Sequence, residues 1–150
     1  MPAWTLEFYA DERGREPCRE WMERDLPDVQ RDALVEALRL VLAELGPDVC
    51  RTEWGKPLGE SLYEFRVRHT AKEIAAMFGG TPPGGKKGER VLLRVFFHAY
   101  GKRVVLLLGG YNKGKDPSER RQQREIATAR KRLDGFKARQ AAERRARRKR

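Results

Sequence analysis

Three cationic side chains lie on or just after segments that are predicted to be β-strands. Arg66 ends the segment Leu-Tyr-Glu-Phe-Arg, Arg94 lies inside residues 90–100, and Lys113 follows residues 103–109. Arginine binds phosphate oxygens with two parallel hydrogen bonds, and lysine supplies a compact positive charge. Cations that surround one phosphodiester stabilise the dianionic phosphorane that forms when an RNA 2′-hydroxyl attacks it. Convergence of these three residues therefore predicts a phosphate-binding site.

Two further side chains near these cations are candidates for proton transfer. His98 shares a predicted strand face with Arg94, and Tyr111 lies with Lys113 in a basic loop expected at residues 110–116. The Tyr111 ring also offers a surface on which a splayed base can stack. The structural alternative stays open at this point, because strand arginines can equally form ordinary ion pairs with Glu64. The remaining candidates for RNA contact are Arg68, Lys102, Arg103 and Lys115.

The net charge of +11 is unevenly distributed along the 150 residues. Residues 1–50 contain 12 acidic and 6 basic residues, whereas residues 51–136 contain 9 acidic and 19 basic residues. Residues 137–150 contain 8 basic residues and one acidic residue. A molecule with one acidic and one basic side attracts polyanions, of which nucleic acids are the most common. For the last segment alone, a solvated helix end or a disordered arm with non-specific affinity is the simpler interpretation.

Several classes of protein are excluded by composition. No apolar run approaches the roughly 20 residues that cross a bilayer, and the first residues lack the pattern of a secretory signal. The two cysteines, Cys18 and Cys50, are too few for a disulfide framework and do not match the spacing of a zinc motif. We therefore expect a cytoplasmic protein with reduced thiols and no membrane association.

The hydrophobic pattern predicts an α+β fold, a small antiparallel sheet with two N-terminal helices and one C-terminal helix. A short strand at residues 4–9 precedes two helices that end at Leu26-Pro27 and at Gly46-Pro47. A loop is expected at residues 46–60 and another at 79–88, with a possible helical turn between 71 and 78. Three antiparallel strands and a last helix complete the order. The expected strands span residues 62–68, 90–100 and 103–109.

The last helix is expected to begin at Asp116, as the N-cap, with Pro117 as its first residue. All helices are expected on one face of the sheet, so that the arginine-bearing face is left open to an anionic ligand. Two segments follow from this interpretation, a folded domain over residues 1–136 and a basic C-terminal tail over residues 137–150.

Four segments resemble the RelE/ParE toxin superfamily, and most closely its HigB-like, phage-derived branch of type II toxin–antitoxin systems. They are Leu62–Arg66, Arg90–Phe97, Val104–Lys113 and the stretch from Asp116 to Arg130. The resemblance covers most of residues 4–136 in the same order and agrees with the predicted fold. In this family Arg66, Arg94 and Lys113 match the strand arginines and the loop lysine of the active site. Where the family often has a histidine, this chain has Leu108, so the proton-transfer group stays open between Tyr111 and His98.

The resemblance implies a ribosome-dependent mRNA endoribonuclease, or mRNA interferase, that inhibits translation without a metal ion or other cofactor. Its partners would be mRNA, ribosomal RNA and a cognate antitoxin, expected to be a helix-turn-helix protein encoded nearby. Two alternatives remain: a ParE-like toxin that inhibits DNA gyrase without cleaving nucleic acid, and a non-toxic RNA-binding protein.

Overall fold

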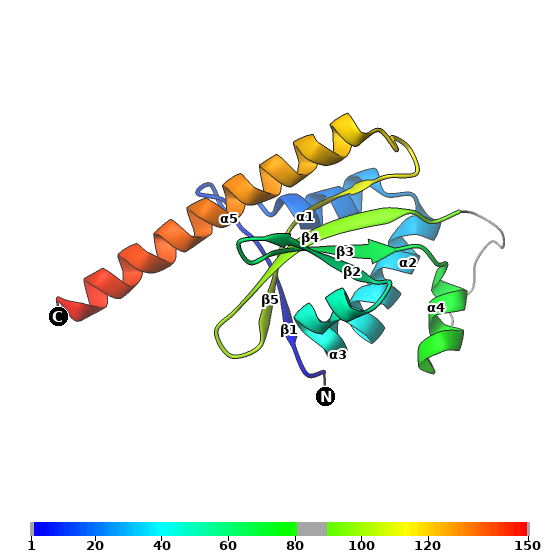
Figure 1. Ribbon diagram of the computed structural model, residues 1–150, viewed down its shortest axis with the longest axis horizontal. Coiled ribbons are helices and arrows are strands. Elements are labelled where there is room, and N and C mark those ends of the chain that lie inside the picture. Colours follow the sequence, from blue (N-terminus) through cyan, green and yellow to red (C-terminus); the bar gives the residue numbers. More distant parts are fainter. Residues whose placement is uncertain (1, 81–89, 150) are drawn as a thin grey trace.

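A five-stranded mixed sheet forms the centre of the computed structural model, which describes residues 2–80 and 90–149 (Figure 1). The strand order is β1-β5-β4-β3-β2. The strands are β1 (Thr5–Phe8), β2 (Gly55–Gly59), β3 (Leu62–Val67), β4 (Leu93–Tyr100) and β5 (Val104–Asn112). The α+β class is therefore confirmed. The loop expected at residues 79–88 falls almost entirely outside the described residues.

The expectation of a purely antiparallel sheet is wrong at one edge. Strands β2 to β5 pair antiparallel with their neighbours, but β1 runs parallel to β5. Strand β5 is apolar on both faces because it lies between β1 and β4 and both of its faces are covered. Strand β2, where only a loop was expected, contains Pro57 and two glycines. These residues are tolerated because β2 forms an edge of the sheet.

One face of the sheet is covered by the predicted pair of N-terminal helices. The first comprises α1 (Pro17–Glu20) and the π-helical turn η1 (Trp21–Asp25). The second runs without a break through α2 (Asp28–Ala37), the π-helical segment η2 (Leu38–Leu42) and α3 (Ala43–Leu45). A 3₁₀ turn, η3 (Gly46–Arg51), leads into β2, and α4 (Ala71–Phe78) packs beside α2. Phe65, Val95 and Leu107 from three strands fill the core beneath these helices.

The opposite face is covered by α5 (Glu119–Arg148), so the expected open face is not present (Figure 1). Phe96, Leu106 and Leu108 project from this face, and they pack against Ala129 and Leu133 of the helix. Burying these two complementary apolar surfaces is favourable at roughly 25 cal/mol per Å². An amphipathic last helix next to a second apolar sheet face therefore closes that face.

Helix α5 begins two residues later than predicted and extends further. Ser118 is the N-cap, and its Oγ accepts a hydrogen bond from the backbone N–H of Arg121 at 3.2 Å. The Asp116 carboxylate instead accepts the Ser118 backbone N–H at 3.1 Å and so organises the turn that precedes the cap. The basic segment expected as a tail is helical as far as Arg148.

Candidate functional site

The predicted site residues of three neighbouring strands form one row across the sheet. Arg94 of β4 lies opposite Arg66 of β3 on one side and opposite Tyr111 of β5 on the other. Directly opposed residues have Cβ atoms about 5 Å apart, so these side chains are neighbours. Lys113 follows two residues after Tyr111 at the end of β5. The structure therefore brings together four of the five predicted catalytic residues.

A buried carboxylate lies among these cations. Glu64 of β3 is fully buried, with its Oε2 at 3.2 Å from Arg66 Nε and its Oε1 at 3.5 Å from Arg94 Nε. The ion pairs that the sequence left open as an alternative are thus formed by both arginines. Arg94 and Glu64 together compensate charges that would be costly to bury alone.

The first turns of α5 close over this cluster. Lys113 Nζ donates a hydrogen bond to Gln122 Oε1 at 3.2 Å, and Gln122 Nε2 donates to Glu64 Oε1 at 3.4 Å. The Arg121 guanidinium lies 5.4 Å from the centre of the Tyr111 ring, and its Nε is 2.9 Å from Glu125 Oε1. The helix thereby contributes polar groups to the site as well as an apolar cover.

Burial divides the row into covered and accessible members. Arg94 is only 3% exposed and Tyr111 is fully buried, so the expectation that both face an open surface is wrong. The cause is the cover that α5 provides over this face. Arg66 and Lys113 are partly exposed and Arg68 is exposed, so these three cations remain available to an anion at the rim.

Two polar atoms of the covered residues are unsatisfied. Within residues 2–80 and 90–149, neither Arg94 Nε nor the Tyr111 hydroxyl has a hydrogen-bond partner. Arg94 Nη1 donates to the Leu93 carbonyl at 3.1 Å, while the 3.5 Å separation from Glu64 is an ion pair and not a hydrogen bond. Buried polar groups without a hydrogen-bond partner are uncommon in folded proteins.

The electrostatic environment shifts the pKa of three side chains. Burial, more than any charge, lowers the pKa of Arg94. Burial and then the neighbouring Arg94 charge lower the pKa of Lys113 below its usual 10.5, which makes its ammonium a stronger proton donor. Burial and then the Glu64 charge raise the pKa of Tyr111 to about 12. Tyr111 is therefore a neutral phenol near pH 7.

His98 does not join this cluster. It lies four residues further along β4 than Arg94, which corresponds to about 13 Å along a strand. Its Nδ1 is 2.8 Å from the carbonyl oxygen of Ser61, and its ring stacks on Tyr100 with centroids 6.4 Å apart. Burial lowers the pKa of His98. The structure therefore does not bring His98 to the arginine row, where a role in proton transfer was expected for it.

The four additional cations predicted to contact RNA separate into two groups. Arg68 follows β3, and Lys115 lies in the turn after β5, where its N–H donates to the Asn112 carbonyl; both are exposed near the arginine row. Lys102 and Arg103 lie in the β4–β5 hairpin, at the other end of these strands. The Arg103 guanidinium there lies 5.9 Å from the centre of the Trp4 ring.

Sequence reasoning missed the contribution of α5 to the site. Gln122 contacts Glu64 across 58 positions of sequence, and no local pattern indicates such a pairing. The only available signal was the amphipathic stripe from Ile126 to Phe136. This stripe shows that the helix must cover an apolar surface, but it does not identify which surface.

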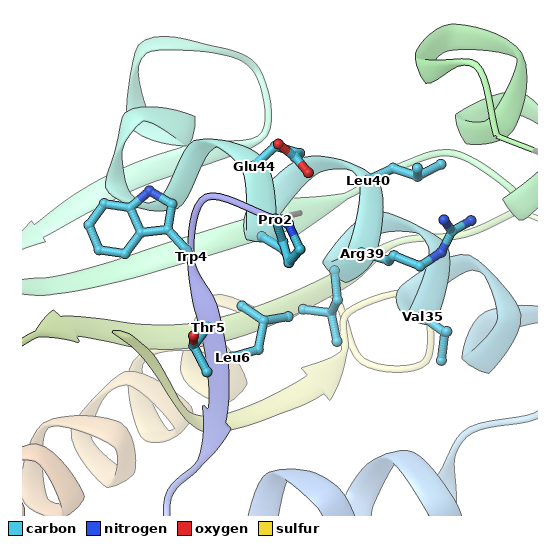
Figure 2. Close-up of a pocket in the computed structure, with 10 residues that line it drawn as sticks. Pro2, Trp4, Thr5, Leu6, Val35, Arg39, Leu40 and Glu44 are labelled. Carbon is cyan, nitrogen blue, oxygen red and sulfur yellow. The ribbon is translucent and has the colours of Figure 1, made fainter. Parts of the chain in front are cut away.

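A separate cavity of about 690 Å³ lies between β1 and the segment α2–η2–α3 (Figure 2). Its lining is mostly apolar, and Arg39 and Glu44 are its charged members. Arg39 is already paired with Glu36 at 3.0 Å. The cavity therefore lacks the convergent charges found at the arginine row, and we take the row as the candidate site.

The other described regions of the chain add no competing site. Residues 2–80 and 90–149 contain no group of three or more His, Cys, Asp or Glu side chains arranged to hold a metal ion. No described helix combines the length and apolar character that crossing a membrane requires.

No family model matches the sequence, and no curated protein matches it at a significant level.

Proposed function

We propose that this protein is a toxin of the RelE/HigB type that cleaves mRNA on the translating ribosome. The observation that carries the proposal is the row Arg66–Arg94–Tyr111 with Lys113 at its end, backed by a buried carboxylate. The antitoxin and the ribosome are proposed partners on the same basis.

The accessible cations take the roles that touch RNA. Arg66 and Lys113 lie at the rim, so they bind the scissile phosphate and stabilise the charge that develops on it. The RNA 2′-hydroxyl attacks phosphorus and loses its proton to solvent water, the bond from phosphorus to the 5′ oxygen breaks, and a 2′,3′-cyclic phosphate and a 5′-hydroxyl result. The ammonium of Lys113, with its lowered pKa, donates the proton that the leaving 5′ oxygen requires.

The covered residues position the accessible ones. Arg94 forms an ion pair with Glu64 at 3.5 Å, and Glu64 in turn binds the Arg66 guanidinium at 3.2 Å. Arg94 is therefore a positioning residue in this arrangement. Tyr111 keeps its proton at neutral pH and so is not the general base.

The test is cleavage of mRNA in a translating extract, read by mapping RNA 5′ ends. The variant Arg66→Gln/Lys113→Gln should lower the cleavage rate by at least about 100-fold, because removal of one transition-state donor alone costs about that much. The control Arg13→Gln/Arg15→Gln removes the same charge from the exposed acidic third and should cleave normally. Equal cleavage by both variants would refute the proposal. Gyrase inhibition with intact RNA would support the ParE-like alternative.

A further inference from the structure

Helix α5 continues beyond the domain that it covers (Figure 1). Its last hydrogen bonds to the rest of the described chain come from Lys137, whose Nζ donates to the Glu60 carbonyl at 3.3 Å, and from Arg139. Arg139 Nη2 donates to the Ala10 carbonyl at 2.9 Å, and its guanidinium lies 5.5 Å from the centre of the Tyr9 ring. Every residue from 142 to 149 is exposed. We call residues 140–149 the arginine arm.

The arginine arm carries its charge over a wide part of its circumference. Its cations are Arg144, Arg145, Arg147, Arg148 and Lys149, and its one acidic residue is Glu143. Successive residues of an α-helix are about 100° apart, so the four arginines cover about 160°. The helix face that packs on the sheet at Leu133 and Phe136 continues along the arm as Gln140, Arg144 and Arg147. Arginine thus replaces apolar residues beyond the sheet.

The chemistry of the arm favours a polyanion over a protein partner. The apolar residues of the arm are alanines, which cannot supply the large anchors that helix–helix and other protein interfaces need. Arginines three and four residues apart also repel one another, as Arg144 does with Arg147 and Arg148. A ligand rich in phosphate relieves this repulsion and stabilises the helix at the same time.

We propose that the arginine arm binds in a groove of folded RNA whose two walls both present phosphates. A flat surface would contact only one side of the helix. Arginines that are spread over about 160° of the helix can contact both walls of a groove. The major groove of regular double-stranded RNA is too narrow for such a helix, so the arm requires a groove widened by a bulge or internal loop. The choice of RNA over DNA rests on the proposed function.

The arm and the candidate site lie at opposite ends of one helix. Gln122 and Arg144 are separated by 22 residues of α5, or about 33 Å at 1.5 Å per residue. The arm therefore contacts RNA well away from the scissile phosphate. This separation also allows binding by the arm and cleavage at the site to be measured independently.

The test is equilibrium binding of a bulged RNA hairpin by the full chain. The variant R144Q/R145Q/R147Q/R148Q should bind at least about tenfold more weakly near 0.1 M salt. The slope of log affinity against log salt should become shallower by about 3 to 4, because each lost phosphate contact removes about 0.9. The control R13Q/R15Q/R24Q/R51Q removes the same charge from exposed positions elsewhere and should bind within about twofold of wild type.

Probe and variant comparisons would overturn the proposal in specific ways. Equal losses for the two variants would show that only net charge matters. Equally tight binding of a regular RNA duplex or a DNA duplex would contradict a widened RNA groove, and preferential binding of polyglutamate would indicate an acidic protein partner. Hairpin binding that persists in Arg66→Gln/Lys113→Gln supports the arm independently. The proposed function fails separately, if ribosomal mRNA remains uncleaved by the wild type.

Discussion

Replacing Glu64 by glutamine tests whether the buried carboxylate holds the arginine row together. Glu64 is fully buried and Arg94 is 3% exposed, so the substitution leaves Arg94 as a buried cation without its counter-charge. Removing one member of a buried ion pair typically lowers the free energy of unfolding by about 3–5 kcal/mol. Arg94→Met should lower it somewhat less, because Glu64 still pairs with Arg66 at 3.2 Å.

A double-mutant cycle measured by urea unfolding separates this coupling from loss of packing. In Glu64→Gln/Arg94→Met the cost should fall short of the sum of the single costs by at least about 1 kcal/mol, since neither charge is then left alone. Arg19→Met is the matched control, because Arg19 and Glu23 are exposed and Glu16 is partly exposed, so the loss of these ion pairs should lower the free energy of unfolding by less than about 1 kcal/mol. Additivity within about 0.5 kcal/mol would refute the reasoning that these charges stabilise one another.

Three further predictions concern single side chains. Tyr111→Phe should keep or raise the free energy of unfolding at neutral pH, because the hydroxyl is buried without a hydrogen-bond partner. The wild type should lose stability between pH 10 and 12, and this loss should be smaller in the variant. That loss arises because the unfolded tyrosine ionises at the lower pH while the folded one, with its raised pKa, does not; unchanged alkaline unfolding would contradict it. Because the pKa of Lys113 is lowered, the cleavage rate of the wild type should fall on the alkaline side at a pH below 10.5. Lys113→Arg should slow cleavage and shift this alkaline fall to higher pH in a pH–rate profile. Gly135→Ala should raise the free energy of unfolding by up to about 1 kcal/mol, because the added Cβ on α5 would meet no other atom. Gly110→Ala should lower it by about 1–3 kcal/mol, because the added Cβ would lie 2.5 Å from the Trp21 ring and 2.8 Å from the Arg94 carbonyl oxygen. Thermal unfolding measures both changes.

Much of the fold follows from local patterns that the sequence displays. Period-two alternation placed Phe65 and Val67 on one strand face and Glu64 and Arg66 on the other, and the structure confirms this division. Gly101 and Lys102 marked the turn between β4 and β5 correctly. Edge strand β2 was missed because glycine and proline give no strand signal, and its pairing with β3 supplies what its own sequence lacks.

Four of the five residues predicted to be catalytic lie together in the candidate site, but the exposure of the site was not predicted. Strand periodicity assigns Arg66 and Arg94 each to one face of its own strand, and the pairing of the strands then brings both together with Tyr111, two residues before Lys113. Whether that face is open depends on where the last helix lies. The apolar stripe of α5 predicts a buried surface of the helix, but two apolar sheet faces were available to receive it.

Local sequence patterns are enough to predict the helices, most strands, the alternation of their faces and the concentration of positive charge after residue 50, because each of these depends on near neighbours in the chain. The packing of α5 over the arginine face, the contact of Gln122 with Glu64 and the position of His98 away from the row become known only from the three-dimensional structure. These outcomes depend on contacts between residues far apart in sequence. The free energy of these contacts comes from burying surfaces that are distant in sequence against each other, and local sequence patterns do not show which surfaces will meet.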